Sequence, residues 1–294
     1  MSRLPLHPGA CGLLALLAAL LACNVPGLVP ELRSAPLTPT APPPAQATAT
    51  PLAAPSPSPE LFVDTGWAQI EPGLEFRQLD IPYSFGGIPA TLVRIDPHYY
   101  LFRVHYDPTN PLPISAWQIR TGAPFIINGG FFMTDNTTLG MLVSDGQVYG
   151  TSFSQHGGML SLSNGVVDLR SLAQMPYQPG EPLDQAVQGR PMLLYPGRFP
   201  AEFDLSPEPS RRTAVAMDWS GHLIFVIVDY GALSLYDLRD WLATTPDLEL
   251  FSALNLDGGG STGMALVAGG ESILFDSWSE VPSVIAFYPV NPSP

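Results

Sequence analysis

Two turns in the sequence place a polar side chain directly before a run of glycines, a pattern that suits the binding of an anion. The first turn is Asn128-Gly129-Gly130-Phe131, and the second is Asp257-Gly258-Gly259-Gly260-Ser261. Glycine tolerates positive φ and lets the backbone approach a ligand closely. Successive backbone N–H groups in such turns form concave anion sites. We therefore predict that both turns face one cleft; the alternative is that each is a tight structural turn.

Other glycine-containing motifs fit the second turn less well. A phosphate-binding P-loop requires a Lys, and the chain has none. Gly259-Gly260-Ser261-Thr262-Gly263 matches the G-x-S-x-G nucleophile elbow, but that reading needs a His after the Ser, and the last His is His222. A dinucleotide-binding fingerprint needs alternating strands and helices, which the sequence does not suggest.

The charge balance excludes a broad class of function. The chain of 294 residues has 12 basic residues, all Arg, against 26 acidic ones, and its formal net charge is −14. Nucleic-acid affinity comes largely from clustered basic side chains, so a nucleic-acid partner is not expected. No His cluster or Asp-rich loop has metal-ligand spacing, so we predict neither a metal nor another cofactor.

The first 60 residues have the features of a membrane-anchored leader and a tether. Gly12–Ala22 is an uninterrupted run of eleven residues that fits a secretory signal and is too short to span a bilayer. It leads into Leu20-Leu21-Ala22-Cys23, which resembles a bacterial lipobox; an ordinary signal peptide is the alternative. Nine Pro and no charged residue lie within the 24 residues of Pro36–Pro59. Such composition favours an extended, unpacked chain, although a glycosylated stretch is also compatible.

These features predict a signal peptide over residues 1–22, a lipid on Cys23 and a tether over residues 23–60. The protein is then extracytoplasmic and attached to the bacterial membrane or cell surface by its acyl chains. Both cysteines, Cys11 and Cys23, lie in this region. The rest of the chain therefore contains no disulfide and no Cys nucleophile.

Residues 61–294 predict one α+β domain with a mixed, mostly antiparallel sheet and a few helices. Residues 223–228 (LIFVIV) are uniformly apolar, as in a central strand. Asp145-Gly146 and Asn164-Gly165 lie between strand-like segments and favour hairpin turns. Ser234 and Asp237 resemble a capping box at the start of a helix over residues 235–242.

Several of these segments together resemble the phosphodiester glycosidase family. The matching residues are Asn128-Gly129-Gly130-Phe131-Phe132, Arg212-Thr213-Ala214-Val215, Asp218-Trp219-Ser220-Gly221-His222 and Asn255-Leu256-Asp257-Gly258-Gly259-Gly260-Ser261. Their order and spacing agree over about residues 90–290. Bacterial members of this family are associated with exopolysaccharides.

The resemblance implies a substrate in which the anomeric carbon of a sugar is linked to a phosphodiester. Asp257 is then the nucleophile or base, with turn capping as its structural alternative. Arg212 would hold phosphate oxygens, or instead form a surface ion pair. Asn128 would contact the sugar or phosphate, or cap a strand. Asp229, at the end of the LIFVIV strand, is the candidate second carboxylate, with a plain turn residue as the alternative.

The sequence also departs from the family pattern in two places. Ala232-Leu233-Ser234-Leu235 stands where the family has Gly-x-Thr-Leu, and no basic residue follows Arg239 where many members carry an Arg. Two hypotheses therefore stay open. The first is a lipid-anchored hydrolase acting on glycosyl phosphodiesters of cell-surface or exopolysaccharide material, and the second is a non-catalytic glycan-binding surface lipoprotein of the same fold.

The lipobox predicts the consequence of Cys23→Ala. The variant should remain an uncleaved precursor or appear as a soluble form, because it lacks the thiol that carries the lipid. Mass spectrometry of the membrane-extracted wild-type protein should show a diacylated Cys23 at the N-terminus. An unmodified N-terminus at another position would contradict the anchor.

Overall fold

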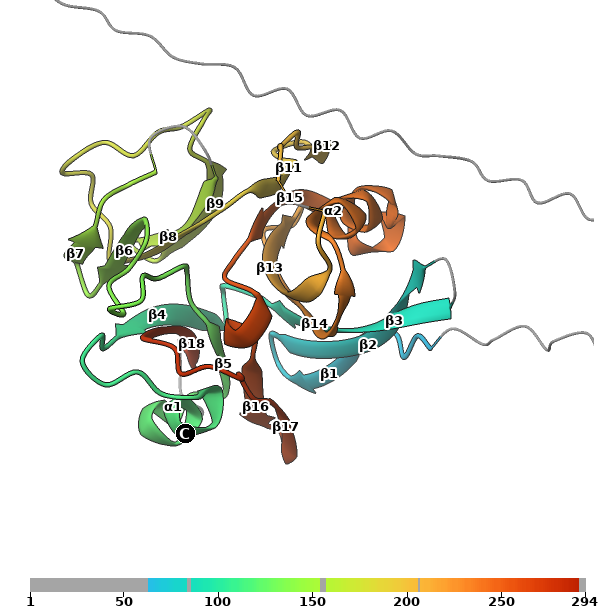
Figure 1. Cartoon of the computed structure of the whole chain (residues 1–294). Helices are drawn as coiled ribbons and strands as arrows, with labels where there is room; N and C mark the ends of the chain where they lie inside the picture. Colours follow the sequence, from blue (N-terminus) through green and yellow to red (C-terminus); the bar gives the residue numbers. More distant parts are fainter. Residues whose placement is uncertain (1–62, 84–85, 154–156, 206, 291–294) are drawn as a thin grey trace, which may run out of the picture. The chain divides into compact units, whose positions relative to one another are not determined.

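The computed structural model describes residues 63–83, 86–153, 157–205 and 207–290, all within one compact unit that spans residues 57–294 (Figure 1). The predicted signal peptide, Cys23 and the tether lie outside the described residues. Within the described ranges, no helix is long and apolar enough to cross a membrane.

The strands form three sheets, and every pair of neighbouring described strands is antiparallel. In spatial order the first sheet contains β1 (Ala68–Glu71), β2 (Leu74–Tyr83), β3 (Gly86–Ile95), β14 (Leu223–Leu233), β13 (Ser210–Asp218), β15 (Leu250–Asn255), β11 (Met192–Tyr195) and β12 (Phe199–Pro200). The second contains β7 (Gln147–Gly150), β6 (Met141–Ser144), β10 (Gln185–Gly189), β8 (Gly158–Ser163) and β9 (Val166–Ser171). The third contains β17 (Glu271–Phe275), β16 (Met264–Ala268), β5 (Phe125–Asn128), β18 (Ser283–Pro289) and β4 (Tyr100–Tyr106).

The helices are α1 (Ile114–Thr121) and α2 (Leu235–Thr244), with short 3-10 turns η1 (Pro246–Leu248) and η2 (Gly259–Ser261). The prediction of a mostly antiparallel domain with a few helices is therefore confirmed. The single mixed sheet is not, because the described strands form three antiparallel sheets.

Local sequence signals account for several of these elements. Asp145-Gly146 and Asn164-Gly165 close the β6–β7 and β8–β9 hairpins, and all four residues have positive φ, as a type I′ turn requires. β14 lies in the middle of the first sheet, between β3 and β13, as its uniformly apolar sequence predicts. The capping box of α2 is complete, because the hydroxyl of Ser234 accepts from the N–H of Asp237 and the Asp237 carboxylate accepts from the N–H of Ser234.

The first sheet is covered on both faces. The leucines of α2, including Leu238 and Leu242, pack on one face, and the α2 ribbon lies beside β11 and β15 (Figure 1). The other face contributes residues such as Val215 and Phe225 to a large core that also contains side chains from the second and third sheets. The three sheets therefore meet around one apolar core, and burial of this core is the main stabilising contribution.

Helix α1 was not predicted, and its cap explains why. Its N-cap is Pro113, whose side chain makes no capping hydrogen bond. The first amides are instead capped from far along the chain: the Asp276 carboxylate accepts from the N–H of Ser115 at 3.0 Å, and the Ser277 hydroxyl accepts from the N–H of Ile114 at 3.3 Å. Helix start signals are local in sequence, so a cap supplied by tertiary contact leaves no such signal.

Candidate functional site

The structure brings the two predicted glycine turns together. Asn128 ends β5 in the third sheet, and Asp257 follows β15 in the first sheet. The Asn128 side-chain Nδ2 donates to the backbone carbonyl of Asp257 at 2.8 Å. The ends of two strands in different sheets are thus joined directly, which places Asp257 beside the first turn.

The side-chain amide of Asn128 is fully buried and hydrogen-bonded on both its nitrogen and its oxygen. Its Oδ1 accepts from the hydroxyl of Thr213 at 2.9 Å and from the N–H of Gly263 at 3.2 Å. Asn128 therefore lies beneath the site as a positioning residue and does not face the pocket described below.

The glycines of the first turn allow close packing. The N–H of Gly129 donates to the carbonyl of Ser283 at 3.0 Å, so this amide is not free to bind an anion. A Cβ at Gly129 would lie 2.3 Å from the hydroxyl of Ser283, and one at Gly130 would lie 2.7 Å from the carbonyl of Gln188. Close packing in a tight structural turn, the alternative to anion binding, therefore accounts for Gly129 and Gly130.

A pocket of about 740 Å³ opens beside the second turn. Its lining includes five of the residues singled out from the sequence: Phe131, Arg212, Asp257, Gly258 and Gly259. The other lining residues come mainly from residues 190–195 and 202–205, which the sequence did not identify; the full additional set is Gly157, Arg190, Pro191, Met192, Tyr195, Glu202, Phe203, Asp204, Leu205, Leu235 and Asn255. Gly260 and Ser261, which lie in η2 with Gly259, are not among the residues that line the pocket.

Asp257 is a half-buried carboxyl group at the pocket wall. Its Oδ1 accepts from the N–H of Gly258 at 3.0 Å. Burial raises the pKa of Asp257 to about 6, against the opposing effect of the hydrogen bonds from Ser261 and Gly258. A carboxyl group that titrates near neutral pH is suited to acid–base chemistry, and such shifts cluster at functional sites.

Arg212 presents a cation to the same pocket. Its Nε donates to the carbonyl of Leu233 at 2.8 Å, and its Nη2 donates to the carbonyl of Glu208 at 2.7 Å. Among the described residues no carboxylate forms an ion pair with its guanidinium. Burial lowers the pKa of Arg212, and Asp237 opposes that shift. Two carbonyls thus orient this charge, and Asp237 acts on it without forming an ion pair, an arrangement that leaves the guanidinium able to bind an anionic ligand.

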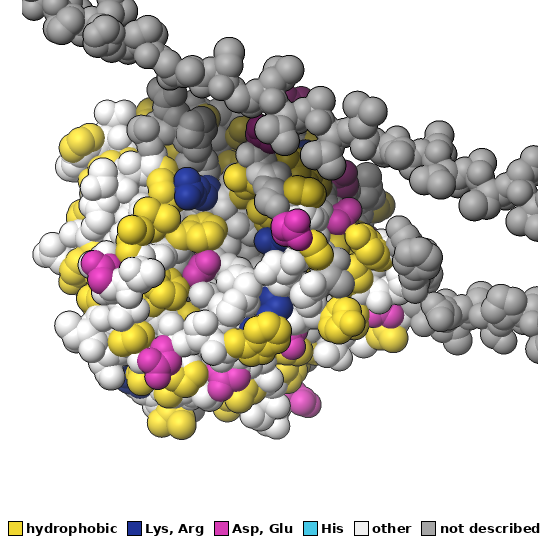
Figure 2. All heavy atoms as spheres, viewed as in Figure 1, with side chains coloured by type: hydrophobic (Ala, Val, Ile, Leu, Met, Phe, Trp, Pro, Cys, Tyr) yellow, Lys and Arg dark blue, Asp and Glu magenta, His cyan; other side chains and the backbone are white. Residues whose placement is uncertain are grey.

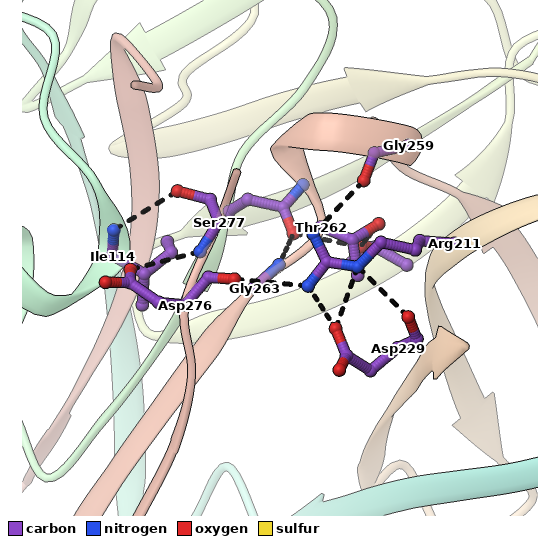
Figure 3. A network of polar contacts seen from close by, with 10 residues as sticks. Ile114, Arg211, Asp229, Gly259, Thr262, Gly263, Asp276 and Ser277 are labelled. Atoms are coloured by element: carbon purple, nitrogen blue, oxygen red, sulfur yellow. Dashed lines mark hydrogen bonds and ion pairs between the residues drawn. The ribbon is translucent and has the colours of Figure 1, made fainter. Parts of the chain in front are cut away.

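Arg211 lies on the opposite face of β13, because successive side chains of a strand alternate. Its guanidinium is almost fully buried and binds the carboxylate of Asp229, with Nε to Oδ1 at 2.8 Å (Figure 3). It also donates to the carbonyl of Gly259 at 3.4 Å and to that of Asp276 at 3.1 Å, and it lies over the ring of Trp278. Arg211 therefore links the second turn to the middle of β14 and to the residue after β17, because β14 continues past Asp229 to Leu233 rather than ending there as the sequence suggested.

Asp229 belongs to this network and lies outside the pocket. The carboxylate that was expected to be the second acidic group is paired with Arg211 and is not among the residues that line the pocket. Two other carboxylates, Glu202 and Asp204, line the pocket with Asp257. Both are exposed, and no hydrogen bond or ion pair joins them to another described residue. No sequence motif marked them, because they lie in an irregular Pro-containing segment after β12.

The charged groups are dispersed across the face shown in Figure 2, where acidic side chains are scattered among apolar and uncharged ones. In the part of the chain that the structure describes, no group of three or more His, Cys, Asp or Glu residues is placed to hold a metal ion.

Comparison with known proteins places this geometry in a family. The model of the phosphodiester glycosidases matches residues 121–288, which include both glycine turns and Arg212. The chain belongs to the phosphodiester glycosidase family. A search of curated proteins returns no match.

Solved structures share the fold of this phosphodiester glycosidase family member. The zebrafish N-acetylglucosamine-1-phosphodiester alpha-N-acetylglucosaminidase catalytic domain, auto-inhibited by its pro-peptide, is 19% identical and has a TM-score of 0.58, and the match covers 77% of this chain and 87% of that one. A hypothetical protein from Synechocystis is also 19% identical, with a TM-score of 0.52, and the match covers 74% of this chain and 62% of that one. At this identity the likeness concerns the fold.

The buried position of Asn128 predicts that Asn128→Ala destabilises the protein. The substitution removes the side-chain partner of the N–H of Gly263 and of the carbonyl of Asp257, while the hydroxyl of Thr213 keeps its contact with the hydroxyl of Thr262 at 3.2 Å. Unsatisfied buried groups cost roughly 1–3 kcal/mol each, so we expect a loss of about 2–5 kcal/mol in the free energy of unfolding. Urea unfolding measures this, with Asn110→Ala at an exposed site as the control. A loss no larger than that of the control would contradict the assigned role.

The raised pKa of Asp257 predicts a pH-dependent stability difference between the wild type and Asp257→Asn. The folded-state pKa of about 6 lies above the ordinary value of 3.8. Between these values the folded protein binds more protons than the unfolded chain, so this group's contribution falls as pH rises. Relative to Asp257→Asn, the wild type should lose stability from pH 4 to pH 7 in urea unfolding. A pH-independent difference would show that burial does not shift this carboxyl group.

Proposed function

We propose that the protein hydrolyses the bond between the anomeric carbon of a sugar and a phosphodiester. The observation that carries the proposal is the presence in one pocket of a half-buried carboxyl group, Asp257, and of the Arg212 guanidinium, which forms no ion pair with a carboxylate of the described residues. The carboxyl group of Asp257 suits a reaction at the anomeric carbon, and the guanidinium of Arg212 suits binding of the phosphate leaving group. Family membership supports the same class of reaction.

In this proposal Arg212 binds the phosphate oxygens in both the ground state and the transition state. The turn at Gly258 and Gly259 lines the adjoining wall, where the positive φ of Gly259 lets the backbone approach a ligand. A phosphate monoester is already a good leaving group. Strong acid assistance at the leaving oxygen is therefore less important here than in ordinary glycoside hydrolysis.

Asp257 then acts at the anomeric carbon, as nucleophile or as the base that activates water. Glycoside hydrolysis commonly uses two carboxyl groups. Glu202 and Asp204 line the pocket, so they replace Asp229 as candidates for the second group. The pair of Asp229 with Arg211 instead supports the wall that carries Gly259.

We further propose that this reaction takes place outside the cytoplasm. The support is the sequence before residue 61: a lipobox-like segment that ends at Cys23 and a Pro-rich tether. A lipid on Cys23 would hold the domain at the membrane, and the tether would extend it toward cell-surface or exopolysaccharide material.

Kinetics of two variants test the assigned roles. The full chain is incubated with a panel of sugar-1-phosphodiesters, and the released sugar is measured. For Asp257→Asn we expect kcat to fall by about 10²–10⁴ with little change in KM, the effect of removing one catalytic group. For Arg212→Gln we expect KM to rise by roughly 10–100-fold, since a charged hydrogen bond made throughout the reaction is lost.

Matched controls are Asp135→Asn and Arg103→Gln, which remove the same charges at exposed positions outside the pocket. Absence of sugar release from the whole panel would favour the non-catalytic glycan-binding lipoprotein instead. Full turnover by Asp257→Asn together with a lower melting temperature would make Asp257 a turn-capping residue.

A further inference from the structure

Two further cavities lie along β7, the exposed edge strand of the second sheet. One has a volume of about 600 Å³ and is lined by residues that include Tyr106 and Tyr149. The other has a volume of about 390 Å³ and is lined by residues that include Tyr177. Gly150, Thr151 and Phe153 line both, so the two cavities adjoin along this segment, one on each face of the β6–β7 edge. We call the two adjoining cavities the β7 groove and define it by Tyr106, Tyr149, Thr151, Phe153 and Tyr177.

The lining of the β7 groove is aromatic and uncharged. Four of its residues are aromatic, the lining also carries the hydroxyl groups of Thr138, Thr151 and Ser152, and none of the described residues that line either cavity is charged. In a chain with a net charge of −14, a surface free of charge selects for a neutral ligand. A sugar ring has apolar C–H faces that pack on aromatic rings and hydroxyl groups that reach polar neighbours.

The shape of the groove is fixed from below by a buried glutamine. Gln188 is 1% exposed, and its Oε1 accepts from the N–H of Phe153 at 2.9 Å and from that of Met141 at 3.1 Å. Its Nε2 donates to the hydroxyl of Ser152 at 2.7 Å. These bonds fix the segment that carries the Phe153 ring, so a ligand would meet a preformed surface at little ordering cost.

A glycine contact fixes the other side of the groove. Gly150 has φ +70°, and a Cβ there would lie 2.1 Å from the carbonyl of Gly140. The segment at residues 137–140 can therefore lie directly against the end of β7. In the wall of the larger cavity, the rings of Tyr106 and Tyr149 pack edge to face with centroids 4.9 Å apart.

A single contact connects the groove to the catalytic pocket. The guanidinium carbon of Arg190 lies 5.3 Å from the centroid of the Phe153 ring. Arg190 lines the pocket that contains Asp257, and Phe153 lines both cavities of the groove. One side-chain pair therefore separates the two sites, a spacing that one extended ligand can bridge.

We propose that the β7 groove binds a neutral stretch of a glycan chain whose phosphodiester-linked sugar occupies the Asp257 pocket. This inference rests on the proposed function and specifies its substrate class as a polymer or long oligosaccharide. Arg190, between the two sites, contacts the chain where it passes from the neutral groove to the phosphate. The aromatic rings supply packing area, and the Asp257 pocket supplies the chemistry.

Affinity electrophoresis of the full chain tests the groove without requiring turnover. Native gels contain dextran, mannan, galactomannan or a soluble β-glucan, with alginate as the anionic comparison. We expect at least one neutral polysaccharide to retard the wild type and alginate not to do so. Tyr149→Ala and Tyr177→Ala should each weaken that retardation by about tenfold in apparent Kd, as loss of an aromatic packing partner implies.

The control is Trp219→Ala, which removes an exposed aromatic side chain that packs on Phe251 and lines none of these cavities. This control and Asp257→Asn should keep the retardation, and thermal unfolding should show that each variant is folded. If none of the neutral polysaccharides retards the wild type, or if neither tyrosine variant changes the retardation, the inference is overturned. Retardation without hydrolysis of any sugar-1-phosphodiester would overturn the proposed function and leave the groove in place.

Discussion

The hydrogen bonds of the buried Asn128 amide are the interaction on which the candidate site depends. They connect the end of β5, the middle of β13 and the turn that follows β15, which belong to two sheets and an intervening turn. Each partner is a buried polar group that would lose its hydrogen bond if the others moved. The backbone of Asp257 is therefore held where the first and third sheets meet, and its side chain points into the pocket.

The adjacent residues Arg211 and Arg212 show how one strand supplies two different functions. Alternation along β13 sends the first toward a buried network and the second toward the pocket. Arg211 is compensated by Asp229 and three neighbouring groups, whereas Arg212 is oriented by two carbonyls and has no carboxylate partner among the described residues. The first cation supports the glycine turn, and the second is available to a ligand.

The burial that raises the pKa of Asp257 also limits what the pocket can bind. A partly desolvated carboxyl group in the same pocket as a guanidinium without an ion-pair partner among the described residues favours a ligand with an anionic portion at Arg212 and an uncharged portion at Asp257. A sugar linked to phosphate has this distribution of charge. The β7 groove, which lies beyond Arg190 and has an uncharged lining, suits a further uncharged portion of the same ligand.

The sequence by itself determined those features whose cause is local. Type I′ hairpins follow from Asp-Gly and Asn-Gly pairs, α2 follows from the Ser234–Asp237 capping box, and β14 follows from an uninterrupted apolar run. The two polar-glycine turns and Arg212 were also identifiable, since their residue types are unusual at strand ends and match a family pattern. These signals cover two hairpins of the second sheet, the central strand β14 of the first sheet and five of the sixteen residues that line the pocket.

Only the tertiary structure decided which of these residues face the ligand. Helix α1 is capped by Asp276 and Ser277, which are more than 160 residues away in the chain. No local sequence pattern therefore predicts where this helix begins. Asn128 and Asp229 satisfy buried partners from other strands, while Glu202, Asp204 and Arg190 reach the pocket from irregular segments. A side chain's role depends on the partners that folding brings to it, and those partners are distant in the chain.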